Sequence, residues 1–189
     1  MNLKRFLARY WITVLAVVTL LSLAVAGRAS AGDGGALRAS ATLRDAQGNA
    51  VGVAYLVEDV AGVLHVNIHA KGLTPGQHGV HLHAAGVCDG STSVSFSSAL
   101  GHHNPTGHQH GLDNPAGSHA GDLPNLDVNA EGVGHLNGTT TRATLSPGAV
   151  TLFDANVSAI VIHAGPDDQL TDPAGNSGPR IACGVLQSE

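Results

Sequence analysis

Short runs of β-forming residues, broken by clusters of glycine, asparagine, aspartate and proline, make up the chain from Ala36 onward, and no stretch there shows a sustained helical period. In the run 63–70, apolar residues alternate with polar ones such as His65 and His69, so one face is apolar and the other faces solvent. The pattern predicts an all-β domain, with strands near residues 36–44, 50–58, 63–70, 79–84, 125–129, 132–136, 139–145, 149–152, 157–163 and 181–186.

Two long segments interrupt this strand pattern. The first runs from the strand that ends near His83 to the strand that begins near Asn125, and its roughly forty residues are rich in glycine, histidine, asparagine and proline. The second covers residues 164–179. Loops of this length inside a compact domain are usually functional, so the two segments are where a site is expected.

The first thirty residues have the features of an export signal. Basic residues precede an apolar run of about 16 residues, which is shorter than the roughly 20 that cross a bilayer. Small residues at positions 29 and 31 then form a signal-peptidase pattern. We predict a signal peptide over residues 1–31 and one domain over residues 32–189, exported to the periplasm, the cell envelope or the exterior. No stable membrane span is expected after processing, and an uncleaved anchor is the alternative.

The composition excludes several classes of partner. Of the 189 residues, 12% are charged and 43% are hydrophobic, and the 12 histidines outnumber the 9 lysines and arginines. The net charge is -5, and loss of residues 1–31 would leave five basic residues against 14 acidic ones, a formal charge of -9. An acidic chain of this kind excludes nucleic acid as a partner, because neutralising phosphates requires a basic face.

The chain contains two cysteines, Cys88 and Cys183, both in the part predicted to be exported. An oxidising compartment allows them to pair. A single disulfide is the simplest interpretation, and two free thiols are the alternative.

His81 and His83 flank one residue in a predicted strand, so their side chains lie on the same face while Leu82 points away. That arrangement suits chelation of one metal ion. Two surface histidines on a polar strand face are the alternative.

The first long loop contains a second group of candidate ligands. His102, His110 and His119 are spaced by eight and nine residues, and Asp122 follows three residues later. Three imidazoles and one carboxylate form a tetrahedral set of the kind that Zn²⁺ prefers in closed sites. A separate site made of imidazoles alone suits Cu²⁺.

Several short motifs occur in an order and spacing typical of one family. They are Gly79-Val80-His81-Leu82-His83, Gly101-His102-His103-Asn104-Pro105, His110-Gly111, His119-Ala120-Gly121-Asp122-Leu123, Val161-Ile162-His163 and Gly178-Pro179-Arg180-Ile181-Ala182-Cys183-Gly184-Val185. With them, the chain after the signal segment resembles the copper/zinc superoxide dismutase family, in particular its bacterial exported branch. The resemblance implies an eight-stranded antiparallel Greek-key β-barrel or sandwich with two long functional loops. It also implies dismutation of superoxide to dioxygen and hydrogen peroxide by copper that cycles between Cu(II) and Cu(I).

The resemblance further implies two metal sites that share one residue. Copper would be bound by His81, His83, His102 and His163. Zinc, as a structural ion, would be bound by His102, His110, His119 and Asp122. His102 would then be a bridging imidazolate that takes part in catalysis.

Supporting residues follow from the same resemblance. Asp167 would hydrogen-bond one ligand of each metal, with the neighbouring Asp168 as its rival. Arg180 would attract the superoxide anion beside the copper, and Cys88 and Cys183 would form the disulfide of the family. The segment between Asp167 and Arg180 is shorter than in well-known cytosolic members and lacks their Glu-Glu-x-x-Lys cluster, so guidance of the substrate is expected to be weaker or built differently.

The remaining histidines are interpreted as solvated or hydrogen-bonded polar residues: His65, His69, His78, His103, His108 and His135. The resemblance leaves the oligomeric state open, a homodimer included. A non-catalytic module that buffers or delivers metal is the main rival to the enzyme, and a structural adhesion-type β domain would leave the spaced histidines unexplained.

Overall fold

A computed structural model of the protein describes residues 35–189. The predicted signal peptide, residues 1–31, lies outside the described residues. Within the described part of the chain, no helix has both the length and the apolar character to cross a membrane.

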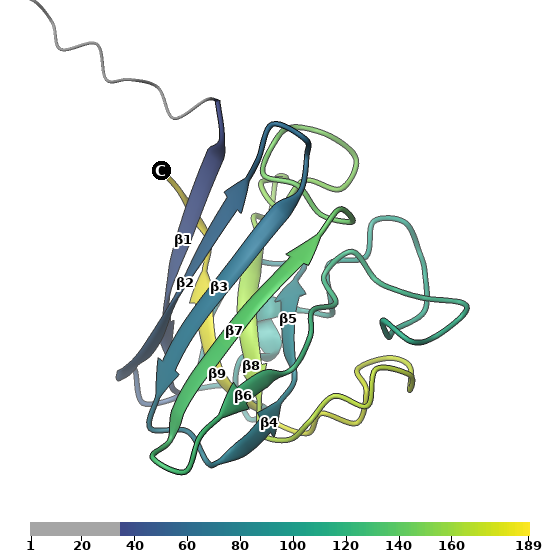
Figure 1. Ribbon diagram of the computed structural model, residues 1–189. Helices are drawn as coiled ribbons and strands as arrows, with labels where there is room; N and C mark the ends of the chain where they lie inside the picture. Colours follow the sequence, from purple (N-terminus) through teal and green to yellow (C-terminus); the bar gives the residue numbers. More distant parts are fainter. Residues whose placement is uncertain (1–34) are drawn as a thin grey trace, which may run out of the picture. The chain divides into compact units, whose positions relative to one another are not determined.

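The described residues form an all-β domain, as predicted (Figure 1). Its only helical element among these residues is a short 3₁₀ turn, η2, at Ser97–Ala99. The strands are β1 (Leu37–Arg44), β2 (Ala50–Glu58), β3 (Leu64–Lys71), β4 (Gly76–His78), β5 (Val80–His83), β6 (Leu126–Val128), β7 (Val133–Thr140), β8 (Ala159–His163), β9 (Arg180–Val185) and β10 (Gln187–Ser188).

All strand pairs are antiparallel, and the sheet order is β4-β6-β7-β3-β2-β1-β9-β8-β5, with β10 added to β1. The two ends of this order, β4 and β5, are separated only by Gly79, so one bent strand nearly closes the sheet into a barrel. The long connections place β7 beside β3 and β9 beside β1, which gives the non-sequential neighbours of a Greek key. With β4 and β5 counted as one strand and the two-residue β10 set aside, the predicted eight-stranded Greek-key barrel is confirmed.

Two predicted strands, 139–145 and 149–152, are wrong. β7 continues without a break through Asn137 and Gly138, because both residues pair with β3. The chain then leaves the sheet, and residues 141–157 form a loop with one isolated bridge between Thr144 and Thr151. Pairing with a neighbouring strand therefore outweighs the local turn preference of the Asn-Gly pair.

Side chains of β1, β2 and β3 alternate between the barrel interior and solvent. On β3 the apolar residues from Leu64 to Ala70 are buried, whereas His69 is exposed and His65 is half-buried. This confirms the solvent-facing interpretation of both histidines. The core is formed by aliphatic side chains, among them Leu43, Leu56, Leu82, Ile160 and Ile162.

Every residue of β5 and β8 is buried, on both faces of the sheet. Leu82 and Ile162 point into the barrel core, while the alternate positions of both strands face outward. Two loops, residues 84–125 and 164–179, cover that outer face, and Figure 1 shows them on one side of the barrel. They contact each other directly: the backbone N–H of Asp113 donates to the carbonyl of Gln169 at 3.1 Å.

A disulfide joins Cys88 in the first loop to Cys183 in β9. The two residues are 95 positions apart. Closing a loop of that size removes entropy from the unfolded chain worth about 4 to 5 kcal/mol in the chain-entropy model. Under the disulfide lies a second apolar cluster, which contains Phe96, Ala99 and Val161. The disulfide thus attaches the first loop to the barrel.

Candidate metal centre

Four histidines from three parts of the chain meet on the outer face of β5. His81 and His83 alternate with Leu82 on β5, and His163 ends the paired strand β8. The fourth, His102, comes from the first loop, where a backbone bridge pairs it with His83. Strand alternation and this bridge together bring the imidazoles to one place, where His81, His83 and His163 are buried.

One ring nitrogen of each of these histidines has no hydrogen-bond partner among the described residues although it is buried: Nδ1 of His81 and Nε2 of His83, His102 and His163. The residues of this group present ligand atoms within 4.8 Å of one another. A buried nitrogen without a partner is costly, and four of them directed at one space fit a metal ion. We refer to these four histidines as the all-histidine cluster.

The other ring nitrogens of three of these residues fix the tautomers. Nδ1 of His83 donates to the carbonyl of Leu100 at 2.9 Å, and Nδ1 of His163 donates to the carbonyl of Gly178 at 2.9 Å. Nε2 of His81 donates to the carboxylate of Asp167 at 2.6 Å. Since a neutral imidazole has one N–H, each remaining nitrogen presents a lone pair to the shared space.

A second cluster surrounds the carboxylate of Asp122. Its Oδ1 lies 3.0 Å from Nδ1 of His102, 3.1 Å from Nδ1 of His110 and 3.2 Å from Nδ1 of His119. Ligand atoms around a tetrahedral zinc ion with bonds near 2.0 Å are separated by about 3.3 Å. The observed separations match that value, so the residues fit zinc. We refer to these four residues as the mixed cluster.

The backbone prepares Asp122 for this position. Its Oδ2 accepts hydrogen bonds from the backbone N–H groups of Gly111 and His119, both at 2.9 Å. Those two bonds leave Oδ1 for the three imidazoles. A backbone bridge between Asp122 and His81 also joins this loop to β5.

His102 belongs to both clusters. Its Nε2 is one of the unpartnered nitrogens of the all-histidine cluster, and its Nδ1 faces Asp122. The ring stacks on His81, with ring centroids 3.9 Å apart. One imidazole between two ligand sets is the arrangement required of a bridging ligand.

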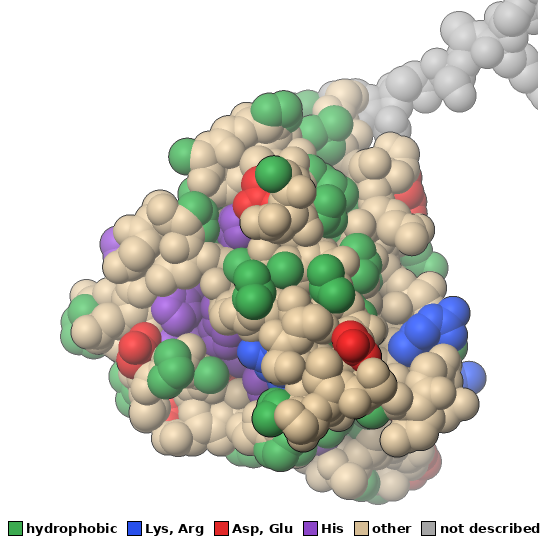
Figure 2. Space-filling model, turned by 180° about the vertical axis from the view of Figure 1, so that it is seen from behind, with side chains coloured by type: hydrophobic (Ala, Val, Ile, Leu, Met, Phe, Trp, Pro, Cys, Tyr) green, Lys and Arg blue, Asp and Glu red, His purple; other side chains and the backbone are tan. Residues whose placement is uncertain are grey.

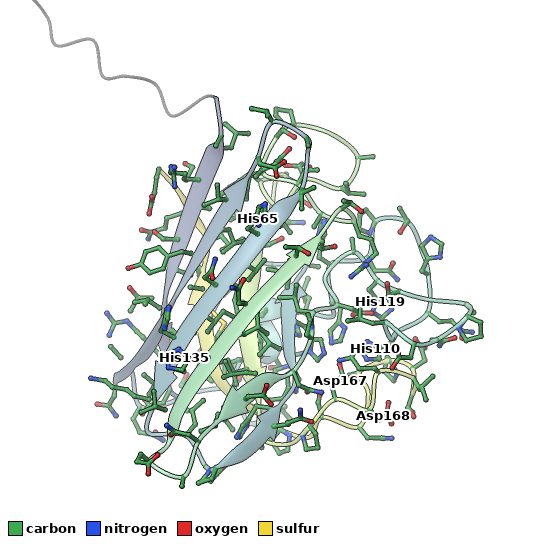
Figure 3. All side chains as sticks on the ribbon, in the orientation of Figure 1. His65, His110, His119, His135, Asp167 and Asp168 are labelled. Carbon is green, nitrogen blue, oxygen red and sulfur yellow. A yellow bond between two sulfur atoms is a disulfide. The ribbon has the colours of Figure 1, made fainter. Side chains whose placement is uncertain are left out.

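Asp167 connects the two clusters from the second loop. Its Oδ2 accepts from His81 and its Oδ1 accepts from Nε2 of His110 at 3.0 Å. Asp168, the rival from the sequence, is exposed and bonds only within its own loop, to Thr171 and Asn176 among others. Figure 3 shows His110, His119 and Asp167 together beside the barrel, with Asp168 farther out along the loop.

Burial sets the charge of the all-histidine cluster. It lowers the pKa of His81 to about 3 and that of His163 to about 4, and it lowers the pKa of His83 well below its ordinary value. These imidazoles are therefore neutral near pH 7, which is the form that binds metal.

Carboxylates dominate the mixed cluster. Burial opposes protonation of His110, but hydrogen bonds from its ring to Asp122 and Asp167 outweigh burial and raise its pKa to about 9. Burial also opposes ionisation of Asp122, and bonds from His102, His110 and His119 reverse that effect and hold its pKa far below the ordinary value. The mixed cluster is thus built around a charged carboxylate.

Arg180, the first residue of β9, is fixed beside the all-histidine cluster. Its guanidinium donates to the carbonyl of Phe96 at 2.5 Å and to the carbonyl of Leu100 at 2.6 Å. Its charge helps to lower the pKa values of His83 and His163. Figure 2 shows histidine side chains gathered in a hollow of this face, with a cationic side chain at its edge.

Two residues that support the site could not be assigned a role from the sequence. Arg142 donates to the carbonyl of Asp122 at 3.1 Å and to that of His119 at 3.4 Å. The side-chain amide of Asn125 accepts from the backbone N–H of Asp167 at 2.8 Å and donates to the carbonyl of Asp167 at 2.9 Å. The one sequence signal for Arg142 was the scarcity of positive charge, since Arg142 and Arg180 are the only lysine or arginine residues after Lys71.

Histidines that were not predicted as ligands lie outside both clusters. The ring of His103 is buried against the carbonyl of Val150, and His108 is exposed. His78 is buried between the carbonyls of Thr74 and His163. None of these residues belongs to a group of potential metal ligands within residues 35–189.

Comparison with known proteins identifies the family. The family model described as copper/zinc superoxide dismutase (SODC) matches residues 50–186. The chain is 44% identical over 153 residues to "Superoxide dismutase [Cu-Zn] 2" of Aquifex aeolicus, covering 80% of this chain and 87% of that protein. It is 41% identical over 142 residues to "Superoxide dismutase-like protein YojM" of Bacillus subtilis, covering 74% of this chain and 71% of that protein.

Solved structures agree with this result. A crystal structure of a SOD-like protein from Bacillus subtilis has a TM-score of 0.72 at 39% identity, over 78% of this chain and 97% of that one. The Cu/Zn superoxide dismutase from Brucella abortus has a TM-score of 0.65 at 28% identity, over 79% of this chain and 99% of that one. On the evidence of its two clusters, its barrel and these matches, the chain belongs to the copper/zinc superoxide dismutase family.

Proposed function

We propose that this protein is a superoxide dismutase that converts two superoxide anions and two protons into dioxygen and hydrogen peroxide. The observation that carries the proposal is the set of four unpartnered imidazole nitrogens in the all-histidine cluster, next to the tetrahedral mixed cluster. Family membership supports the same activity.

The all-histidine cluster is the proposed copper site, formed by His81, His83, His102 and His163. A copper ion that cycles between Cu(II) and Cu(I) supplies the one-electron chemistry that protein side chains lack. His81, His83 and His163 supply three neutral nitrogen ligands in an enclosed space, and His102 would supply the fourth as the bridging imidazolate. Asp167 keeps His81 in the tautomer that presents Nδ1 to that space, through the hydrogen bond at 2.6 Å.

The mixed cluster is the proposed zinc site. Zinc has no redox chemistry, so its role is structural. Its ligands come from the first loop, and Asp167 joins that loop to the second one through His110. The cluster therefore holds the loops together and fixes the ring of His102 from its Nδ1 side.

His102 is the proposed carrier of a proton. Its Nε2 faces the all-histidine cluster and its Nδ1 stays with the mixed cluster. We propose that Nε2 takes up a proton from solvent as the first superoxide is oxidised and gives it up, together with a second proton from solvent, as the second superoxide becomes hydrogen peroxide. The fixed Nδ1 side returns the ring to the same position after each cycle.

Arg180 is the proposed guide for the anion. Its guanidinium donates to two backbone carbonyls, so the side chain is fixed and its positive charge stays beside the all-histidine cluster. The second loop holds three aspartates before Arg180 and no lysine. Arg180 therefore provides the local attraction that steers superoxide within an acidic protein.

We also propose that the protein is exported, with residues 1–31 as a cleaved signal peptide and residues 32–189 as the mature domain. The disulfide between Cys88 and Cys183 supports an oxidising compartment, because such bonds persist there and are rare in the cytosol. Mass spectrometry of the protein recovered from its native cells tests this, and an intact N-terminus would contradict cleavage.

The decisive experiment is metal analysis of the mature protein reconstituted with both ions, together with a dismutation assay with and without a copper chelator. The expected result is about one copper and one zinc per chain and activity that the chelator abolishes. His163→Ala should abolish activity while the circular dichroism of the fold is unchanged. Bound metal without activity in the wild type would overturn the proposal and favour a module that only buffers metal.

A further inference from the structure

Two exposed histidines lie side by side on the outer face of the barrel. His69 on β3 and His135 on β7 are directly opposite each other in the antiparallel register. Their Nδ1 atoms are 2.8 Å apart, and their ring centroids are 4.8 Å apart with the planes at 82°. Figure 3 shows His135 on the sheet, away from the labelled residues of the mixed cluster. The proposed dismutase function uses neither residue.

We propose that His69 and His135 form a second, peripheral site for Cu²⁺. With metal–nitrogen bonds near 2.0 Å, two nitrogens 2.8 Å apart subtend an angle of about 90° at the ion. That angle suits two adjacent corners of the tetragonal geometry that Cu(II) prefers. Imidazole also binds Cu²⁺ more tightly than Zn²⁺, so the pair favours copper.

The sheet places the two residues side by side before any ion binds. Both residues lie inside long paired strands, so their Cα positions are set by the ladder between β3 and β7. Terminal torsions of histidine are broad, and both rings are exposed, so each Nδ1 can turn its lone pair toward a shared ion. Binding therefore costs the rotation of two side chains, the loss of their mutual hydrogen bond and the shift of one ring proton from Nδ1 to Nε2.

Nearby charges modulate the site. Asp127 on β6 is directly opposite His135, and its Oδ1 accepts from Gln77 at 3.0 Å. Its negative charge favours a bound cation on this row of the sheet. Lys71 lies two positions along β3 from His69 and is exposed, so its long side chain is able to extend into solvent, away from the ion.

In the absence of metal, the pair shares one N–H between two neutral rings. A hydrogen bond of this kind on an exposed surface adds little stability, because water competes for both groups. The ion replaces a weak interaction with two coordinate bonds. The site is open to solvent, so bound copper would exchange readily.

Equilibrium dialysis tests the proposal on protein already saturated with one copper and one zinc. Added Cu²⁺ should bind to about one further site per chain in the wild type. The double variant His69→Gln/His135→Gln should lose that uptake and keep its dismutase activity. His65→Gln is the matched control, since His65 also lies on the outer face of β3 and should leave the uptake unchanged. The readout is the difference in Cu²⁺ uptake between the wild type and the variants. This difference does not depend on whether the protein is a superoxide dismutase.

Electron paramagnetic resonance of the extra copper gives a second readout. The expected spectrum is that of a tetragonal Cu(II) centre with hyperfine coupling to two nitrogens, and the double variant should lack it. Equal copper uptake by the wild type and the double variant would overturn the site. Zinc binding at the same site as tight as copper binding would overturn the tetragonal assignment.

Discussion

Asp167 accepts a hydrogen bond from His81 at 2.6 Å, between two fully buried side chains 86 positions apart in the chain. The same carboxylate accepts from His110 through its other oxygen. A single side chain therefore orients one residue of each cluster, and an amide at this position could accept from only one of them.

Asp167→Asn is expected to weaken binding of both metals, by roughly 10-fold to 100-fold each, since residues that orient ligands have effects of this size. Competition with a chelator of known affinity measures the change. Asp168→Asn is the matched control, because it removes the adjacent charge while leaving both histidines in place. Equal metal affinity in the two variants would show that Asp167 does not orient the ligands.

Arg180→Glu is expected to slow superoxide removal by roughly 10-fold or more, because steering by local charge changes association rates by at least that factor. Metal content should be unchanged, and Arg180→Lys should have an intermediate rate, because a lysine cannot keep the two-carbonyl geometry. The measurement is the second-order rate at several salt concentrations.

Lys71→Glu changes the total charge by the same amount at an exposed site on β3 and is the control for this prediction. Its rate should stay close to that of the wild type. If both charge reversals slow the reaction equally, the net charge of the protein guides superoxide and the position of Arg180 is irrelevant.

Arg142→Ala is expected to weaken zinc binding by roughly 10-fold, because the guanidinium holds the backbone carbonyls of two residues of the mixed cluster, His119 and Asp122. Copper affinity measured with zinc already bound should change much less. Isothermal titration of each metal separates the two effects. A larger loss for copper than for zinc would mean that Arg142 acts on the fold as a whole.

Glu58→Gln is expected to destabilise the fold by about 1 to 3 kcal/mol, the cost of leaving a buried donor without an acceptor. Glu58 is buried at the end of β2 and accepts from the backbone N–H of Leu145 at 2.5 Å and from Ser146 at 2.6 and 2.7 Å. Denaturant unfolding measures the change. Glu131→Gln, at an exposed turn, should have little effect.

The effect of Glu58 depends on pH. Burial opposes ionisation, but the hydrogen bonds from Ser146 and Leu145 outweigh it and hold the pKa of Glu58 below its ordinary value. A carboxylate with a lowered pKa stabilises the fold above its unfolded pKa, and this contribution is lost as the pH falls through its folded pKa. The difference in unfolding free energy between wild type and Glu58→Gln should therefore be greatest near neutral pH and shrink in acid. A difference that is constant with pH would contradict this account.

Local patterns predicted the parts of the site that are close in sequence. Strand alternation was enough to place His81 and His83 on one face, because side chains two positions apart in a strand point to the same side. The predicted strand 139–145 failed because pairing with β3 carries β7 through Asn137 and Gly138, and the loop that follows is bonded to Glu58, a residue more than eighty positions earlier. Partners at such distances leave no periodic signal in the sequence.

The arrangement around the mixed cluster depends on similar long-range contacts. Arg142 and Asn125 act through backbone carbonyls and amides, which every residue has. The residue whose backbone forms such a hydrogen bond can be of any type, so its identity does not predict the contact. The resemblance to a family supplied the proposed ligand set, whereas the supporting hydrogen bonds required the fold.

Because the imidazole of His102 belongs to both clusters, ions bound at the two proposed sites would not bind independently. An ion that orients this ring from its Nδ1 side lowers the entropy cost for an ion arriving at Nε2. Thermodynamic reciprocity then requires the second ion to strengthen the first by the same factor. The affinity of either metal is consequently a property of the pair, and a value measured with the partner site empty describes a different equilibrium from the one in the fully loaded protein.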